Sequence, residues 1–203
     1  MLQWMFRKKP AGVAPPAKAA SSRDSVPVGV DQPDTLAKAI EIVSQDPLDP
    51  IANCGLGKIY LDMNRIEEAK ACFEKALTLE PDYAEAHYKL GNAVRIQGRL
   101  DEALACYKTA ISLNPDYAEA HCNEGVAYEA RGDRNQAMAS HRRALSISPS
   151  LANAHFNLGR LLVAQGDSAE ALACFHKVIA LDPDFTEAHI AEGLVHNEKP
   201  SVE

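Results

Sequence analysis

Small, apolar and polar residues recur along this chain with a fixed period of 34 residues. The segments 50–83, 84–117, 118–151 and 152–185 align without a gap. Counting each segment from 1, position 8 is always glycine, position 20 is always alanine and position 32 is always proline. Position 24 carries a ring in every segment: Phe73, Tyr107, His141 and Phe175. A period of this length indicates a row of stacked structural units rather than a single globular core.

Each 34-residue segment predicts two antiparallel helices. In the second segment, Leu90, Gly91 and Val94 lie on one face of a first helix, and positions 20, 24 and 27 follow helical spacing on a second helix. Glycine at position 8 and alanine at position 20 let the two helix axes approach closely, while the ring at position 24 fills the groove beside them. One such pair buries too little apolar surface to fold alone, so neighbouring segments must supply the rest.

The junctions between segments predict a helix end followed by a helix start. Proline at position 32 stops each second helix. Asp116 with Glu119 three residues later has the spacing of a capping box for the next first helix. The same spacing occurs at Asp82 with Glu85 and at Asp184 with Glu187.

With these positions in place, residues 50–198 resemble the tetratricopeptide repeat family. The resemblance implies an all-α fold, a right-handed solenoid of antiparallel helix pairs. It also implies that the first helices line a concave groove that holds a segment of another protein. The expected role is therefore protein binding rather than chemistry.

The flanks of the repeats have a different composition. Residues 1–32, rich in proline and alanine, predict a disordered tail. We expect the repeat domain to cover 33–198, with an N-terminal capping helix in 33–49 and a C-terminal capping helix in 186–198. Glu192 stands at position 7 of the last helix, where an apolar residue is expected, so this helix presents a polar end face.

Composition narrows the possible partners and the location. The net charge is −7, which argues against a nucleic-acid partner, because binding one needs a basic stripe on the protein surface. Five cysteines with no CxxC motif favour a reducing compartment, hence the cytoplasm. No apolar run approaches the roughly 18 residues of a membrane span. In the opening MLQWMFRKK the apolar residues precede the basic ones, the reverse of the order in a secretory signal. A disordered start is favoured, and peripheral membrane contact by residues 1–9 is the alternative.

The third segment departs from the pattern at two positions. Glu124 replaces the apolar residue of position 7, and His141 stands at position 24. These positions face each other across the helix pair, and a buried carboxylate without a partner is costly, so we expect Glu124 and His141 to be hydrogen-bonded. The pair is interpreted either as a compensated polar core that loosens this segment or as a pH-sensitive hinge.

Ladders of reactive residues follow the repeats, but their spacing argues against chemistry. Neighbouring helices lie about 8–10 Å apart, farther than two nitrogens on one zinc ion (about 4 Å) or the Cα atoms of a disulfide (about 7 Å). We therefore expect packing roles at the repeat interfaces. The ladders are His87, His121, His155 and His189 at position 4 and Cys72, Cys106 and Cys174 at position 23.

Motif searches give no sign of catalysis. The GLGK sequence at 55–58 resembles a phosphate loop, but Ile59 follows its lysine and both glycines belong to the repeat pattern. No nucleophile with a base, zinc motif or dinucleotide fingerprint occurs. The sequence predicts no enzymatic activity, no metal and no cofactor.

The family resemblance assigns positions 2, 5, 6, 9, 12 and 13 of each first helix to the groove. Basic side chains among them favour an acidic or neutral peptide as ligand. The predicted groove residues are Lys58, Tyr88, Lys89, Asn92, Arg95, Asn123, Phe156, Asn157 and Arg160.

Asn123 and Asn157 share position 6 within the run AHxN, which is similar to the repeats of O-linked N-acetylglucosamine transferase. In that family these asparagines grip a peptide backbone, and a carboxamide offers the donor and acceptor to do so. Gly55, Lys89 and Ala191 interrupt the ladder here, and no catalytic domain of that enzyme is expected. The carboxylate clamp of chaperone adaptors matches at only two of its five positions.

These observations predict a non-enzymatic module that binds an extended segment of a partner protein in its groove. Two alternatives remain open: a membrane-associated assembly scaffold recruited through residues 1–9, and an accessory subunit of a glycosyltransferase. The sequence leaves the oligomeric state open.

Overall fold

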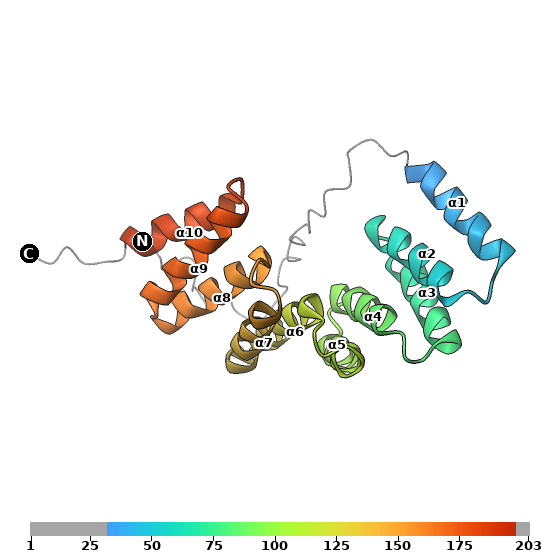
Figure 1. The fold of residues 1–203 in the computed structure, drawn as a ribbon, viewed down its shortest axis with the longest axis horizontal. Coiled ribbons are helices and arrows are strands. Elements are labelled where there is room, and N and C mark those ends of the chain that lie inside the picture. Colours follow the sequence, from blue (N-terminus) through green and yellow to red (C-terminus); the bar gives the residue numbers. More distant parts are fainter. Residues whose placement is uncertain (1–31, 198–203) are drawn as a thin grey trace, which may run out of the picture. The chain divides into compact units, whose positions relative to one another are not determined.

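A computed structural model describes residues 32–197 of the chain, in which every regular element is an α-helix. This confirms the all-α solenoid of antiparallel helix pairs (Figure 1). Residues 1–31 of the predicted tail, which include residues 1–9, lie outside the described residues, and its last residue, Gln32, is the first residue of a helix. No helix in the described range has the length and apolar character to cross a membrane.

The helices follow the 34-residue period in two alternating sets. First helices are α2 (Pro50–Asp62), α4 (Ala84–Ile96), α6 (Ala118–Arg131), α8 (Ala152–Gln165) and α10 (Thr186–Asn197). Second helices are α1 (Gln32–Gln45), α3 (Ile66–Leu79), α5 (Leu100–Leu113), α7 (Arg134–Ile147) and α9 (Ser168–Leu181). From α2 to α10, consecutive helices pack on each other, whereas α1 packs on none of the other described helices.

The glycine at position 8 sets the distance between the helices of a pair. A Cβ atom built on Gly91 would lie 2.6 Å from a carbon of the Tyr107 ring. The corresponding distance is also 2.6 Å at Gly57, Gly125 and Gly159. Tyr107, Phe73 and Phe175 are fully buried, so the structure confirms that the ring at position 24 fills the groove beside a close helix contact.

A left-handed residue turns the chain from each first helix to its second. Gly98, Gly132 and Gly166 have φ of 78°, 94° and 96°, and Asn64 occupies the same position in the first segment with φ of 58°. Glycine meets this requirement without strain, and asparagine is among the few other residues that tolerate it. This position 15 marks the tight turn inside every segment.

The predicted capping boxes are wrong. The N-caps of α4 and α6 are Tyr83 and Tyr117, one residue later than expected, and neither forms a side-chain capping bond. Within the described residues, Asp184 forms no such bond either. The backbone N–H of Asp116 instead donates to the Oδ1 atom of Asn114 at 3.2 Å.

The histidine ladder at position 4 ties each junction together. Each imidazole Nε2 lies within hydrogen-bond distance of the carbonyl oxygen of the proline six residues earlier, at 2.8–3.1 Å. A carbonyl only accepts, so Nε2 carries the proton and donates. The pairs are His87 with Pro81, His121 with Pro115, His155 with Pro149 and His189 with Pro183.

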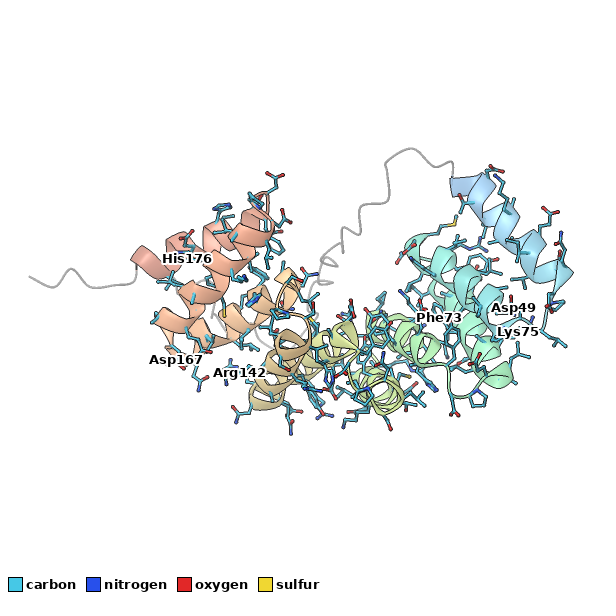
Figure 2. The ribbon with its side chains drawn as sticks, in the orientation of Figure 1. Asp49, Phe73, Lys75, Arg142, Asp167 and His176 are labelled. Carbon is cyan, nitrogen blue, oxygen red and sulfur yellow. The ribbon has the colours of Figure 1, made fainter. Side chains whose placement is uncertain are left out.

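Charged side chains on the second helices bridge neighbouring segments. Arg142 of α7, labelled in Figure 2, contacts Glu170 of α9 at 3.1 Å. Arg143 contacts Asp116 at 3.3 Å. These pairs are exposed, so each contributes at most about 1 kcal/mol. The apolar contacts between helices therefore dominate the stability of the stack.

Candidate functional site

Three of the predicted groove residues meet in one hydrogen-bonded cluster on α4 and α6. The Nδ2 atom of Asn123 donates to the hydroxyl of Tyr88 at 3.0 Å and to Oδ1 of Asn92 at 2.8 Å. The hydroxyl of Tyr107, from α5, donates to the same Oδ1 atom at 2.8 Å. The cluster fixes the orientation of Asn123, because its NH2 group has two acceptors on the preceding first helix.

The same contacts leave the Oδ1 atom of Asn123 unoccupied. Within residues 32–197, this oxygen has no hydrogen-bond partner, and the side chain is only half-buried. A carboxamide oxygen accepts up to two hydrogen bonds. The cluster therefore presents an oriented acceptor.

Asn157, one segment further along, has a different neighbour. Its side chain lies within hydrogen-bond range of the Cys122 thiol on α6. Burial raises the pKa of Cys122 to about 12, and the contact with Asn157 acts in the opposite direction. The thiol is neutral near neutral pH. Both asparagines thus reach back to the first helix of the preceding segment, to different partners.

Aromatic rings pack together beside the hydrogen-bonded cluster of Asn123. The Tyr88 ring lies 6.1 Å from that of Tyr107 and 4.9 Å from that of Tyr117, measured between ring centroids. Burial raises the pKa of the Tyr88 hydroxyl, which therefore stays neutral and available for hydrogen bonding. Position 34, the place of Tyr117, was not among the predicted groove positions, although its rings recur at Tyr83 and Phe185.

A second ring cluster repeats this arrangement two segments later. Phe156 lies 6.1 Å from Phe175 and 5.0 Å from Phe185. Position 5 holds Cys54 in the first segment and Cys122 in the third, rather than a ring. The aromatic surface therefore alternates along the stack.

The four predicted basic residues have different surroundings. Arg160 pairs with Glu129 at 3.1 Å and lies over the Phe156 ring, so its charge is largely compensated. Lys89 lies over the Tyr88 ring with its Nζ atom 5.4 Å from the centroid. Lys58 is exposed and has no ion-pair partner within the described part of the chain.

Arg95 is the distinctive cation of this surface. Its Nε atom is buried without a hydrogen-bond partner, and no carboxylate pairs with it among residues 32–197. It lies close enough to Tyr107 for its charge to oppose the rise in pKa that burial causes at that hydroxyl. A guanidinium without a carboxylate partner beside the asparagine cluster fits a ligand that brings a negative charge.

The expected bond between Glu124 and His141 is not formed. Ser140 donates from its hydroxyl to Glu124 Oε2 at 2.7 Å, because position 23, rather than position 24, faces position 7. His141 is fully buried against Gly125, and both ring nitrogens lack partners within the described residues. Burial, with a smaller contribution from the Arg160 charge, lowers the pKa of His141 to about 4.

The remaining reactive residues form no assembly of their own. All five cysteines are free thiols. No group of three or more His, Cys, Asp or Glu residues within the described ranges has a geometry that would hold a metal ion. The candidate site is therefore the polar and aromatic surface of α4, α6 and α8, which offers hydrogen bonds and ring faces.

Comparison with sequence families supports the repeat pattern. A family model described as TPR repeat matches residues 57–95, 91–132 and 130–166. A second, described as Tetratricopeptide repeat, matches residues 152–185. Among characterised proteins, E3 ubiquitin-protein ligase TTC3 of Mus musculus is 42% identical over an alignment of 59 residues, and the match covers 26% of this chain and 3% of that protein. The likeness to the ligase is thus confined to a small part of it.

Comparison with solved structures supports the fold over most of the chain. The crystal structure of MamA matches with a TM-score of 0.66 at 25% identity, covering 77% of this chain and 92% of that one. YrrB, described as a TPR protein with an unusual peptide-binding site, matches with a TM-score of 0.64 at 23% identity, covering 78% of this chain and 82% of that one. At these identities, the arrangement of helices is what is shared.

Proposed function

The chain belongs to the tetratricopeptide repeat family, whose members bind other proteins, and on this premise we propose that α4, α6 and α8 bind an extended segment of a partner protein. The proposal concerns the surface defined by Tyr88, Asn92, Asn123 and Asn157, with Arg95 beside it. We place this binding in the cytoplasm, where five free thiols are stable.

The oriented oxygen of Asn123 is the observation that carries the proposal. Its NH2 group is held by Tyr88 and Asn92, so the Oδ1 atom is available to accept a backbone N–H from a ligand. An extended chain rises about 3.3 Å per residue, and neighbouring helices lie about 8–10 Å apart. About one residue in three of the bound chain would therefore lie opposite an asparagine. The arrangement resembles the asparagine ladder of O-linked N-acetylglucosamine transferase, shortened to Asn123 and Asn157.

The charges of the surface favour an acidic ligand. Arg95 has no carboxylate partner within residues 32–197, whereas Arg160 is already paired with Glu129. A carboxylate of the ligand would pair with the half-buried Arg95 guanidinium, whose charge no carboxylate among residues 32–197 offsets. Such charge-assisted bonds are about twice as strong as neutral ones.

The test measures binding to an array of nine-residue peptides, about 30 Å when extended, that differ in net charge. We expect acidic peptides to bind more tightly than basic peptides of matched hydrophobicity. The double substitution Asn123→Ala with Asn157→Ala removes two hydrogen bonds and should weaken binding about tenfold.

Asn135→Ala is the matched control, because Asn135 is an exposed asparagine on the second helix α7. It should leave binding unchanged. Equal binding by the double variant and the wild type, with both folded by circular dichroism, would show that the groove is not the binding surface.

A further inference from the structure

The described helices begin and end with unmatched halves of a repeat. Helix α1 begins 34 residues before α3 and so has the phase of a second helix, while α10 begins 34 residues after α8 and has the phase of a first helix. Helix α1 packs on no other described helix, and α10 packs on α9 and α8 only. A second helix at one end and a first helix at the other would together make one complete repeat.

Helix α1 exposes the face that a first helix normally covers. Ile42 occupies position 27, where Ala76, Ala110, Ala144 and Val178 are fully buried in the complete segments. In α1, the Ile42 side chain is 54% exposed. The side chain that should meet a first helix therefore faces open space.

Helix α10 exposes the complementary face. Gly193 stands at position 8, yet a Cβ atom built there would meet nothing within 4 Å, whereas Gly91 has the Tyr107 ring at 2.6 Å. Ile190 stands at position 5 of α10. In the fourth segment, the residue at this position, Phe156, packs against Phe175, the ring at position 24 of the second helix. Ile190 is 58% exposed. Among the described residues, no second helix packs against the Gly193 face of α10.

The charges at the two ends are complementary. In the third segment, position 7 contacts position 23, since the Ser140 hydroxyl bonds Glu124 at 2.7 Å. At the unmatched ends, position 7 is Glu192 and position 23 is Lys38. The same helix pairing would place an ammonium group against a carboxylate.

Both of these charged groups already contact a neighbour of their own chain. Lys38 pairs with Asp34 at 2.6 Å, and Glu192 bonds His176 at 2.6 Å. Lysine has three N–H donors and a carboxylate about four acceptor sites, so each can take a further partner.

We propose that α10 of one copy packs against α1 of a second copy, completing a repeat and joining the copies head to tail. The contact would continue the first-helix to second-helix interface that the chain forms four times within itself. The contact joins two different surfaces, α1 (the head) and α10 (the tail). Each added copy therefore leaves one free head and one free tail. Such a heterologous contact builds open chains rather than a closed dimer.

The test measures the mass of the full chain by light scattering and sedimentation as its concentration rises. Wild type should grow stepwise beyond two copies. Ile42→Asp blocks the head and Ile190→Asp blocks the tail, so each variant alone should remain a monomer. An equimolar mixture of the two should form two-chain complexes and nothing larger, since one intact tail meets one intact head.

A control substitution and a charge swap separate this interface from nonspecific association. Ile96→Asp changes an equally exposed isoleucine, 48% exposed on α4, and should assemble like wild type. Lys38→Glu and Glu192→Lys should each weaken assembly, and the double variant should restore it.

Several outcomes would overturn the proposal. Wild type that stays monomeric at every concentration would mean that α1 is covered by another occupant, such as residues 1–31 of its own chain or a different protein. A closed dimer would contradict the head-to-tail contact. So would a mixture of the two isoleucine variants that stays monomeric while both variants remain folded by circular dichroism.

Discussion

At the scale of single residues, the third segment shows how one position changes a core. His141 takes the place of Phe73, Tyr107 and Phe175, yet it gains no hydrogen bond, because position 24 faces Gly125 and it is Ser140 at position 23 that reaches Glu124. A buried polar atom without a partner costs about 1–3 kcal/mol. The segment therefore keeps the repeat geometry at reduced stability.

Replacing this histidine by an aromatic ring should stabilise the protein. We expect His141→Phe to raise the free energy of unfolding by about 1–3 kcal/mol at pH 7, since the variant removes two buried nitrogens and restores the ring of the other segments. Urea unfolding of both proteins measures the difference. A less stable variant would mean that the His141 nitrogens have partners in solution.

The stability gap should also depend on pH. The folded pKa of His141 is about 4, below the value of about 6.5 in an unfolded chain, so the unfolded state binds the proton first. Wild type should therefore lose stability relative to His141→Phe as the pH falls from about 6.5 towards 4, by up to about 1.4 kcal/mol per pH unit. A gap that stays constant between pH 7 and pH 5 would contradict a buried neutral imidazole.

At the scale of helices, the glycine at position 8 decides how closely a pair can pack. A methyl group on Gly91 would overlap the Tyr107 ring, whereas Gly55 lies on the open side of α2 with nothing within 4 Å of its Cβ position. The two glycines occupy similar helices and differ only in what lies beside them. They form a matched pair for testing the close contact.

We expect Gly91→Ala to destabilise the protein by about 1–3 kcal/mol, because the Tyr107 ring or the helix axis must move. Gly55→Ala should stabilise it by up to about 1 kcal/mol, because alanine favours helix and meets no neighbour. The midpoints of urea unfolding measure both effects. Similar shifts in the two variants would rule out the steric role of position 8.

At the scale of the whole molecule, the period of the sequence was sufficient to predict the fold. The repeated residues recur at fixed spacings along the sequence, and each marks a contact or a helix end in the structure. In the second segment they are Gly91, Ala103, Tyr107 and Pro115. The recurrence of Gly98, Gly132 and Gly166 at position 15 is an equally strong sequence signal for the turn inside each segment.

Contacts between neighbouring segments could not be predicted in the same way. The sequence placed Asn92, Asn123 and Tyr88 on one surface, but not the bonds that join them, because these depend on the rotation between successive helix pairs. The same rotation brings Tyr117 beside Tyr88 and pairs Arg160 with Glu129. The capping boxes failed because the N-caps of α4 and α6 are the tyrosines that follow the aspartates, so each helix begins two residues after its aspartate.

The most direct measurement is a nuclear magnetic resonance titration of the full chain with the tightest-binding acidic peptide from the array. The account predicts shifts of the side-chain amide signals of Asn123 and Asn157 and of the backbone of α4, α6 and α8. Signals of the outer second helices α5 and α7 should move little. Shifts confined to α5 and α7, or no change at the two asparagine amides, would contradict binding in the groove.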